Sequence, residues 1–422
     1  MERNWAGTYE FTAPRIEAAT SVDEVRALVA REAATAGKVH ALGTRHSFTD
    51  LPDTAGTLID VSGLDGVLAL DEEARTVTVA AGTRFGVLAL WLEERGWALH
   101  NLGSLPHISV GGATATATHG SGDRNGVLTT AVGAISYVGA DGEVHDLARG
   151  DADFPAAVAG VGGFGITVAL TLDIQPSYRM RQDIYAGVTW DAALEDLSAV
   201  TGAGYSVSVF TSWDDTTLDS VWVKTRLAHD DDPVPDALLD GHRKDPASPL
   251  GDEHDPNLTT LGGVPGPWLH RLPHFRLDGT PSFGDEIQSE YFVPRADAVA
   301  TLQAVRGLAD SIRPLLFVSE LRTAAADDLW LSGASGRDTL AIHFTWRNDA
   351  AGVARVIPQI EEALAPFGAR PHWGKYHSFD AVRMAQVHPR LADARAVFER
   401  LDPEGRFRNA HLQRVGLRAR EV

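Results

Sequence analysis

Side chains that could carry chemistry recur two residues apart in four segments of the second half of the chain. The four pairs, each set among apolar or aromatic neighbours, are Gln288/Glu290, Glu320/Arg322, His343/Thr345 and Trp373/Lys375. In a β-strand, residues i and i+2 share a face, so each pair would present its two side chains together. Such a surface offers donors and acceptors to a polyhydroxylated ligand. An arginine and a lysine near one reacting oxygen would also stabilise negative charge there.

A solvated sheet face is the alternative, because antiparallel sheets commonly turn one polar face to water. For any single strand that alternative is the better one. Four strands together favour a ligand site, since water-facing strands are usually rich in Lys, Thr and Ser. This set instead combines Gln, Glu, Arg, His, Thr and Lys.

A glycine-led turn, residues 43–48 (GTRHSF), follows an apolar run, Val39 to Leu42, that is typical of a strand. A turn in this position brings backbone N–H groups to a ligand, and phosphate oxygens fit such a nest. The turn also presents a histidine, His46. A histidine alone is usually a surface or core residue, but three further motifs strengthen the prediction. They are 103–112 (GSLPHISVGG), 118–122 (THGSG) and 372–375 (HWGK).

Residues 160–165 (GVGGFG) fit the pattern G-x-G-x-x-G of dinucleotide sites. That pattern requires a strand before it and a helix after it. Here a helix-like segment, Phe154 to Ala159, precedes and a β-rich one, Ile166 to Leu170, follows. We therefore expect no nicotinamide site.

Two other histidine features predict no metal site. His270 and His274 are four residues apart, but Pro273 between them argues against one helical face. His254 lies in an acidic segment typical of a solvated loop.

Composition sets the remaining bounds. The chain has 422 residues, which suggests two domains, and a net charge of −20, which disfavours nucleic acid and anionic membranes as partners. It has no cysteine, which excludes disulfides, thiolate catalysis and zinc–thiolate sites. No secretion signal and no apolar run of transmembrane length are visible, so we expect a cytoplasmic enzyme.

The elements that would position these groups begin with a capping box, Ser21 to Glu24, which predicts a helix that Gly37 closes. Glycine turns then separate short elements, and we assign residues 1 to about 176 to one α+β domain. The further elements predicted in this part are strands at 58–61, 77–80 and 166–174, a helix at 83–94 and a hairpin of 135–138 with 143–147.

The second domain begins with strands at 205–210 and 221–226. Amphipathic helices are predicted at 296–308 and 353–364. A segment at about 230–285, rich in Pro, Gly, Asp and His, is long for a loop and is therefore expected to be functional or only partly ordered.

Taken together, the motifs resemble those of flavoproteins of the vanillyl-alcohol-oxidase type, and among them those of alditol (xylitol) oxidases, relatives of the aldonolactone oxidases. The resemblance runs nearly end to end. It implies an α+β, two-domain fold. Residues 1–176 would form the FAD-binding domain, to which the C-terminal segment 370–422 returns, and 177–369 would form a substrate domain with an antiparallel sheet.

The resemblance also implies the site residues. His46 would carry FAD covalently, through a ring nitrogen and the flavin 8α carbon. The other cofactor-binding residues would be Ala41, Leu42, Gly43, Thr44, Arg45, Ser47, Ser104, Ser109, Gly112, Ala113, Thr114, Ala115, Thr118, His119, Gly120, Ile166, His372 and Lys375. The substrate-binding residues would be Ser104, Gln288, Glu320, Arg322, His343, Thr345 and Lys375.

The implied reaction oxidises the terminal primary alcohol of an alditol, such as xylitol or sorbitol, to the aldose, with O2 reduced to H2O2. Lys375 and Arg322 would stabilise alkoxide character, and His343 or neutral Lys375 would accept the hydroxyl proton. Glu320 would fix Arg322 and bind a neighbouring hydroxyl. Gly103, which has no side chain to block O2, favours an oxidase over a dehydrogenase. No metal is expected, and we expect a monomer.

A sugar-1,4-lactone oxidase or dehydrogenase of the same superfamily is the first alternative, and a cofactor-free carbohydrate-binding protein is the distant one. One departure from the pattern concerns Arg45, where many relatives have glycine. If this position requires a positive φ, arginine is costly there. The alternative is that Arg45 has a binding role and places its positive charge near the pyrophosphate of FAD.

Overall fold

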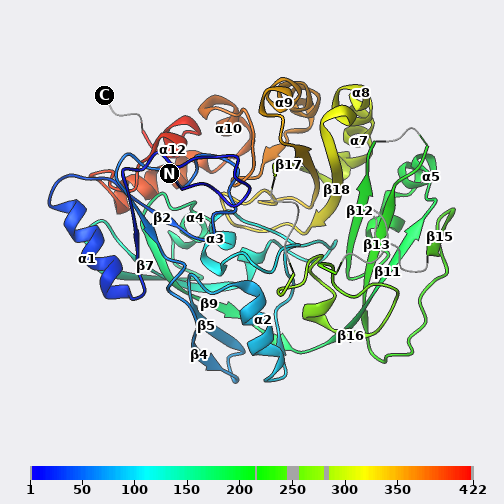
Figure 1. Ribbon diagram of the computed structural model, residues 1–422, viewed down its shortest axis with the longest axis horizontal. Helices are drawn as coiled ribbons and strands as arrows, with labels where there is room; N and C mark the ends of the chain where they lie inside the picture. The colour runs from blue at the N-terminus through cyan, green and yellow to red at the C-terminus, as the bar shows by residue number, and fades with distance from the viewer. Residues whose placement is uncertain (1, 214–215, 245–255, 280–284, 420–422) are drawn as a thin grey trace.

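The computed structural model of the chain describes residues 2–213, 216–244, 256–279 and 285–419. Within these residues the strands form four sheets, and Figure 1 shows the N-terminal strands on one side of the molecule and the large sheet on the other. Parts of the long segment predicted at about 230–285, and His254 with it, lie outside the described residues. The described helices include none long and apolar enough to cross a membrane.

Two sheets lie in the N-terminal part. A small parallel sheet has the order β1-β3-β2, with β1 at Arg15–Ala18, β3 at Thr57–Asp60 and β2 at Val39–Leu42. An antiparallel sheet has the order β4-β5-β9-β7-β8, at Val67–Asp71, Thr76–Ala80, Ile166–Asp173, Val132–Val138 and Val144–Ala148. The strands predicted here are confirmed within a few residues, and β7 with β8 forms the predicted hairpin. A third, two-stranded sheet pairs β10 (Gln175–Pro176) with β6 (Trp97–Ala98).

Helix α1 (Val22–Ala33) starts as its capping box predicts, since Ser21 Oγ accepts from the Glu24 amide at 3.2 Å. Its end differs from the prediction. The left-handed residue after the helix is Ala36, with φ 54°, and Gly37 donates its amide to Glu32 O. The second predicted helix is α2 (Phe85–Glu93), which Gly96 follows with a positive φ of 77°.

Residues 160–165, which fit the pattern G-x-G-x-x-G, join a helix to a strand, as the sequence predicts. Helix α4 (Phe154–Ala157) precedes it and β9 follows it. The order required by a dinucleotide-binding turn is therefore reversed in the structure.

The large sheet is antiparallel throughout and holds the polar pairs. Its order is β14-β15-β11-β13-β12-β18-β19-β17-β20, with β16 paired to β11. The bounds are Ala237–Leu238, Gly241–Lys244, Arg179–Ala186, Ser220–Leu227, Ser206–Thr211, Leu316–Ala324, Thr339–Arg347, Glu286–Pro294 and Arg370–Pro371, with β16 at Gly266–Pro267. Strand β11 was not predicted, because Arg179, Arg181 and Asp183 interrupt its apolar pattern.

The central strands of this sheet are buried on both faces, with different chemistry on each. In β17, Ile287, Tyr291 and Val293 face the core, while Glu286, Gln288 and Glu290 fall on the opposite face. Tyr291 donates its hydroxyl to Glu361 of helix α9 (Ala350–Leu364) at 3.0 Å. The polar side chains of β17 are buried too. The alternative that they form a sheet face exposed to water is therefore wrong.

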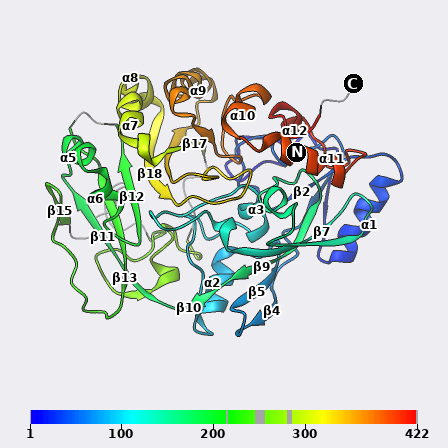
Figure 2. The ribbon, with the colours of Figure 1, turned by 180° about the vertical axis from the view of Figure 1, so that it is seen from behind.

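Helices cover the apolar face of the large sheet, and both ribbon views show α7 and α9 beside β17 and β18 (Figures 1 and 2). The predicted helix at 296–308 divides into a 3-10 turn, Arg295–Asp297, and α7 (Ala298–Arg306), followed by α8 (Ala309–Ile312). The other helices are α3 (Val110–Ala115), α5 (Trp190–Glu195), α6 (Leu197–Thr201), α9 (Ala350–Leu364), α10 (Ala381–Val387), α11 (Leu391–Leu401) and α12 (Ala410–Arg414).

The last helix lies against the N-terminal part of the chain. Arg414 of α12 forms an ion pair with Asp50 at 2.5 Å, and Asn409 donates to the backbone oxygens of Leu51 and Asp53. These contacts accord with a C-terminal segment that completes the N-terminal domain, although the boundaries at 176 and 370 stay predictions.

Candidate active site

Three adjacent strands bring their polar pairs into one row. Strand β19 lies between β18 and β17, and its His343 is in register with Glu320 on one side and Glu290 on the other. Two residues further along β19, Thr345 is in register with Gln288 of β17. The sheet therefore sets one imidazole between two carboxylates.

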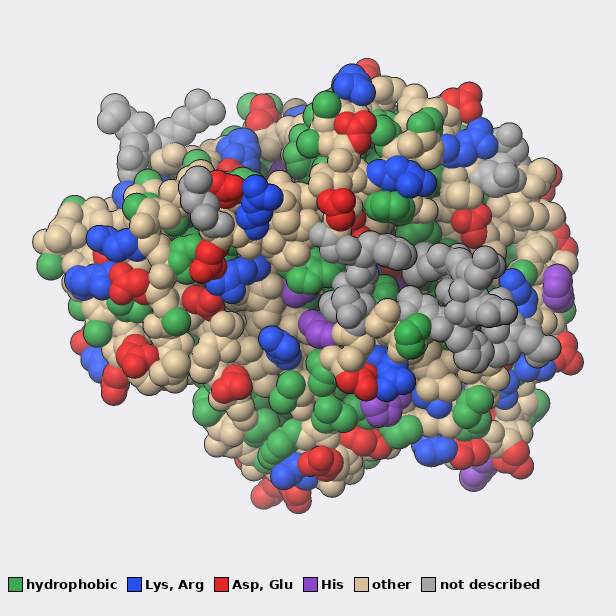
Figure 3. All heavy atoms as spheres, in the orientation of Figure 1, with side chains coloured by type: hydrophobic (Ala, Val, Ile, Leu, Met, Phe, Trp, Pro, Cys, Tyr) green, Lys and Arg blue, Asp and Glu red, His purple; other side chains and the backbone are tan. Residues whose placement is uncertain are grey.

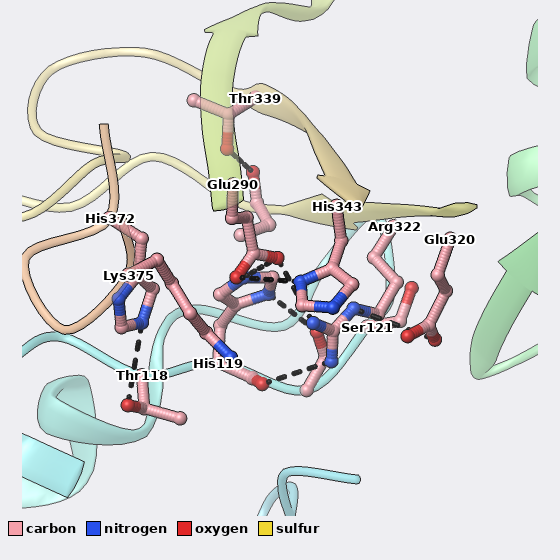
Figure 4. A network of polar contacts seen from close by, with 12 residues as sticks. Thr118, His119, Ser121, Glu290, Glu320, Arg322, Thr339, His343, His372 and Lys375 are labelled. Atoms are coloured by element: carbon pink, nitrogen blue, oxygen red, sulfur yellow. Dashed lines mark hydrogen bonds and ion pairs between the residues drawn. The ribbon is translucent and has the colours of Figure 1, made fainter. Parts of the chain in front are cut away.

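The Glu290 carboxylate is the centre of this polar network (Figure 4). Its Oε1 accepts from Arg322 Nη2 at 3.0 Å and lies 3.0 Å from His119 Nε2, while Oε2 lies 3.5 Å from His343 Nδ1. Glu290 is only 2% exposed. Burial raises the pKa of Glu290, but the charges of His119 and Arg322 outweigh this effect and hold the pKa well below its usual range. The carboxylate is therefore ionised at pH 7.

Arg322 is held on several sides. Its Nη1 donates to Ser104 Oγ at 3.2 Å, and its Nε lies 3.6 Å from Glu320 Oε1. Burial lowers the pKa of Arg322, but Glu320 and Glu290 outweigh it, and the net direction is upward. A permanently charged guanidinium thus lies at the cavity wall with its geometry fixed by two carboxylates.

A second buried chain of polar groups ends at Glu320. His274 Nε2 lies 2.7 Å from Glu320 Oε1, and its Nδ1 lies 3.1 Å from Lys224 Nζ. The Glu320 carboxylate can only accept, so Nε2–H of His274 donates to it and Nδ1 accepts from Lys224. Burial lowers the pKa of Lys224 to about 7 and that of His274 to about 4. Lys224 also donates to Leu272 O.

Lys375 enters the site from a turn, so the predicted strand pair Trp373/Lys375 is wrong. The Lys375 amide donates to His372 O at 3.0 Å and the Gly374 amide to His372 Nδ1 at 3.1 Å, which closes a tight turn after β20. Trp373 consequently points into the core, where its Nε1 donates to Leu331 O. Lys375 points the other way and lines the cavity.

The ammonium of Lys375 donates to Gln288 Oε1 and lies 5.0 Å from the centre of the Phe48 ring. Burial lowers the pKa of Lys375 to about 8, although Glu290 opposes the shift. Lys375 is therefore charged in most molecules at pH 7 and loses its charge in mildly alkaline solution.

The other side of the cavity is built by the glycine-led turn after β2. Ala41, Leu42 and residues 43–48 all line it. The backbones of Gly43 and Gly112 approach Ser109 closely, since a Cβ at either glycine would lie 3.0 Å from Ser109 Oγ. A side chain at either position would require the Ser109 hydroxyl to shift, so glycine suits this close approach.

Arg45 adopts the left-handed conformation that the sequence left open, with φ 62°. Its guanidinium forms ion pairs with Asp60 at 2.8 Å and with Glu2 at 2.7 Å. These contacts offset part of the cost of a positive φ, which is of order 1 kcal/mol or more for a non-glycine residue.

The imidazole of His46 lines the cavity. Neither ring nitrogen forms a well-aligned hydrogen bond with the residues that the structure describes, although both nitrogens are buried. Burial lowers the pKa of His46 to about 4, so the ring is neutral at pH 7. Buried polar atoms in native proteins almost always have a partner, which points to a bound group at this position.

The two sides enclose one cavity of about 380 Å³ that runs from His46 to the Glu290 network. Its size, the glycine cradle at one end and the unsatisfied His46 ring together fit a cofactor that has a flat ring system and phosphates, such as FAD. In the space-filling view, histidine side chains (purple) reach the surface near the middle of the molecule, and acidic and basic side chains are interspersed over this face (Figure 3).

Most of the predicted site residues line this cavity. They are Ala41, Leu42, Gly43, Thr44, Arg45, His46, Ser47, Ser104, Gly112, Ala113, Ala115, Thr118, His119, Gln288, Glu320, Arg322, His343, Thr345, His372 and Lys375.

Four predicted residues lie behind the cavity wall. Ser109 and Thr114 belong to the segment of α3, where Thr114 donates its hydroxyl to Val110 O. A side chain at Gly120 would collide with Leu102 and Asn101. The side chain of Ile166 packs in an apolar cluster beside α1.

Two residues central to the network were missed. Glu290 was paired with Gln288 by its spacing but was not assigned a role, because sequence alone does not show that Arg322 and His119 converge on it. His274 was considered only as a metal ligand, whereas it binds the Glu320 carboxylate. The cavity also has an apolar part that no motif indicated, with walls from Phe210, Trp222, Leu258, Phe275 and Val318.

Two family models match separate parts of the chain. A model of the FAD binding domain matches residues 14–148, and a model of D-arabinono-1,4-lactone oxidase matches residues 285–415. Both matches contain segments that line the cavity.

Full-length relatives are similar over almost the whole chain. The alditol oxidase of a Streptomyces species is 41% identical, with 97% of both chains covered. The L-gulono-1,4-lactone dehydrogenase of Mycobacterium tuberculosis is 30% identical, with 98% of both covered.

Solved structures share the fold at low sequence identity. Cholesterol oxidase from Brevibacterium sterolicum has a TM-score of 0.78 at 15% identity, covering 98% of this chain and 96% of that one. Xylooligosaccharide oxidase from Myceliophthora thermophila has a TM-score of 0.72 at 15% identity, covering 100% and 94%.

Proposed function

The chain belongs to the FAD-dependent alditol and aldonolactone oxidases, which have the vanillyl-alcohol-oxidase-type fold, and we propose that it oxidises the terminal primary alcohol of an alditol to the aldehyde with O2 as electron acceptor. The observation that carries the proposal is the single cavity joining the buried His46 ring to a wall of charged, hydrogen-bonding side chains. FAD binds at the His46 end, and the polyol chain binds along β17, β18 and β19. His46 carries the flavin covalently in this proposal.

Bound FAD would supply the two-electron acceptor for the alcohol and the means of transferring the electrons to O2. The protein's part is to bind the alcohol, to remove its hydroxyl proton and to stabilise the resulting negative charge. Arg322 and Lys375 supply positive charge at the reacting oxygen. Gln288, Thr345 and Ser104 bind further hydroxyls of the substrate.

Nε2 of His343 is the proton acceptor in this proposal. The Glu290 carboxylate, 3.5 Å from Nδ1, favours the tautomer that carries its proton on Nδ1. Nε2 is then the basic atom, and Thr345 Oγ1 lies 3.1 Å from it, within reach to donate. Burial lowers the pKa of His343, so the ring is neutral at pH 7 and able to accept a proton. Lys375, with its higher pKa, keeps the electrostatic role.

Oxidation of a sugar lactone is the second candidate. It is favoured by the lactone-oxidase match over residues 285–415, which include Gln288, Glu320, Arg322, His343 and Lys375. A lactone presents a ring and fewer free hydroxyls, whereas an extended polyol uses more of the donors and acceptors on the three strands.

The test begins with the purified protein after acid precipitation. Flavin fluorescence that stays with the denatured protein band, and is lost in His46→Ala, supports the covalent link. Flavin released to the supernatant contradicts the link but not the enzyme. Peroxide release is then compared for xylitol, sorbitol and L-gulono-1,4-lactone. A higher kcat/KM for the lactone would overturn the alditol assignment in favour of the second candidate.

The remaining features are proposals of the same kind. We expect a monomer in the cytoplasm, and an FAD-binding domain formed by residues 1–176 with 370–422 around a substrate domain at 177–369.

A further inference from the structure

A short N-terminal hairpin, residues 2–11, lies over the turn that carries His46. Its two arms are joined by hydrogen bonds from Asn4 N to Tyr9 O at 2.9 Å and from Phe11 N to Glu2 O at 3.0 Å. Both ribbon views show the start of the chain beside α12, a helix near the other end of the sequence (Figures 1 and 2). The hairpin is thus a defined element that the mechanism described above does not use.

The aromatic ring of Trp5 in this hairpin stacks on the imidazole of His46. The ring centres lie 5.0 Å apart and the ring planes differ by 18°. Trp5 and His46 both line the cavity. Because the His46 nitrogens form no well-aligned hydrogen bond, the stack is a main restraint on the plane of the imidazole.

The hairpin is fastened to both neighbours of His46. The Trp5 amide donates to Arg45 O at 2.8 Å, and Asn4 Nδ2 donates to Ser47 O at 3.0 Å. Asn4 also shapes its own hairpin, since its Oδ1 accepts from the amides of Thr8 and Tyr9. One asparagine therefore couples the fold of the hairpin to the position of the histidine.

We infer that Trp5 is a positioning residue for the covalent attachment of the flavin: it holds the His46 imidazole in the plane from which a ring nitrogen reaches the 8α carbon. The inference rests on the proposed function, in that it presupposes the covalent link to His46. The geometric reason is that bond formation requires a fixed near-attack arrangement, and the Trp5 stack restrains the plane of a ring whose nitrogens form no well-aligned hydrogen bond.

A bond forms between an imidazole nitrogen and the 8α carbon, while one C–H bond of the 8α methyl group and the imidazole N–H bond are broken. The two hydrogens leave as protons and two electrons pass to O2, so that one H2O2 forms for each flavin attached. No other oxidant is needed.

The experiment follows attachment, not turnover. Full-length protein made under riboflavin limitation is mixed with FAD in air, and the flavin fluorescence of the acid-denatured protein is recorded over time. Trp5→Leu keeps an apolar side chain but removes the ring that stacks, whereas Trp5→Phe keeps a ring. Loss of an aromatic contact predicts that attachment in Trp5→Leu is slowed about 10-fold, with Trp5→Phe within about 2-fold of the natural protein.

Two controls separate positioning from other effects. Trp91→Leu removes a half-buried tryptophan of α2 that is not part of the cavity lining, and should attach flavin at the normal rate. The affinity for non-covalently bound FAD is measured in His46→Ala and in the double variant that also carries Trp5→Leu. The two affinities should be the same.

The outcomes are distinguishable. Equal attachment rates in Trp5→Leu and the natural protein would overturn the inference and leave the covalent link intact. A parallel loss of non-covalent FAD affinity would also overturn it, because Trp5 would then only form part of the binding surface. If the natural protein itself retains no flavin after acid treatment, the covalent link fails and the role of Trp5 fails with it.

Discussion

Arg322 combines a buried positive charge with contacts to two carboxylates and to Ser104. If it stabilises the developing alkoxide, Arg322→Ala should lower kcat by at least about 100-fold, the scale observed when one charge stabiliser is lost. The variant should still bind flavin, since the cofactor end of the cavity lies at His46. Steady-state kinetics and the absorbance spectrum of the purified variant measure both effects.

The matched control is Arg313→Ala. Arg313 precedes β18 and is exposed beside Asp310, so its removal should leave kcat unchanged. Near-normal turnover in Arg322→Ala would contradict the role assigned to Arg322.

Lys375 predicts the pH dependence of the reaction. Its charged form is present below a pKa of about 8 and disappears above it. If the ammonium stabilises the alkoxide, kcat/KM should fall as the pH rises through about 8. In Lys375→Arg this decline should move to higher pH, because guanidinium stays charged. The pH profile of kcat/KM tests both statements, and a decline at the same pH in Lys375→Arg would assign it to another group.

Gly103 gives a prediction about oxygen. It lines the cavity, and a Cβ there would lie 3.7 Å from Ile108 Cδ1, which is ordinary van der Waals contact. Gly103→Ala should therefore fold normally. If the missing side chain admits O2, this variant should reoxidise more slowly with O2 but react normally with an artificial electron acceptor. Stopped-flow reoxidation distinguishes this from a general loss of activity.

At the scale of elements, β17 carries site residues on one face and packs against helix α9 with the other. Its polar face supplies Gln288 and Glu290, and its other face docks on α9 through Tyr291 and Glu361. Glu361 is fully buried and also accepts from the Ser378 amide at 2.8 Å and from Arg383 at 2.8 Å. This carboxylate joins the helix, the strand and the segment that follows Lys375.

Removing this carboxylate should be costly. Glu361→Ala leaves the Tyr291 hydroxyl and the Arg383 guanidinium without their acceptor, and we expect the free energy of unfolding to fall by about 3 kcal/mol. Glu362→Ala changes the next residue of the same helix, which is exposed, and should cost less than about 0.5 kcal/mol. Urea denaturation measures the free energy of unfolding of both variants. An equal loss in the two would contradict the conclusion that Glu361 joins the helix, the strand and the segment after Lys375.

At the scale of the whole molecule, buried histidines should set the acid limit of stability. Burial lowers the pKa of His40 to about 4, and that of His372 and of His377 to about 3. In the unfolded chain these groups titrate near about 6.5. Between these values the unfolded state binds more protons than the folded state, so stability is complete above about pH 6.5 and declines as the pH falls below it.

Each such histidine contributes up to about 1.4 kcal/mol per pH unit in that range. Urea denaturation at pH 7.0, 6.0 and 5.0 should therefore show a decline in the free energy of unfolding before most carboxylates titrate. His229→Ala removes an exposed histidine and should leave the slope unchanged. A free energy of unfolding that stays constant down to pH 5 would mean that the buried rings are protonated in the folded protein.

Several features could be predicted from local sequence because local physics determines them. The capping box predicted the start of α1, the Asp141-Gly142 turn predicted the hairpin, and residues 160–165 were correctly predicted to have a helix before them and a strand after them. The period of two placed Gln288, Glu320, Arg322, His343 and Thr345 on the cavity faces of their strands, because that period is fixed by backbone geometry alone.

The sequence could not show which of these faces meet. Glu290 became the centre of the network only because β19 pairs between β17 and β18, and because His119 arrives from a distant turn. Trp373 and Lys375 have the spacing of a strand pair but lie in a turn, since hydrogen bonds to His372 decide the local conformation. The stack of Trp5 on His46, and the chain from Lys224 through His274 to Glu320, likewise join residues far apart in sequence. Spacing along the chain determines what one element presents, whereas contacts between elements depend on long-range packing, which only the tertiary structure decides.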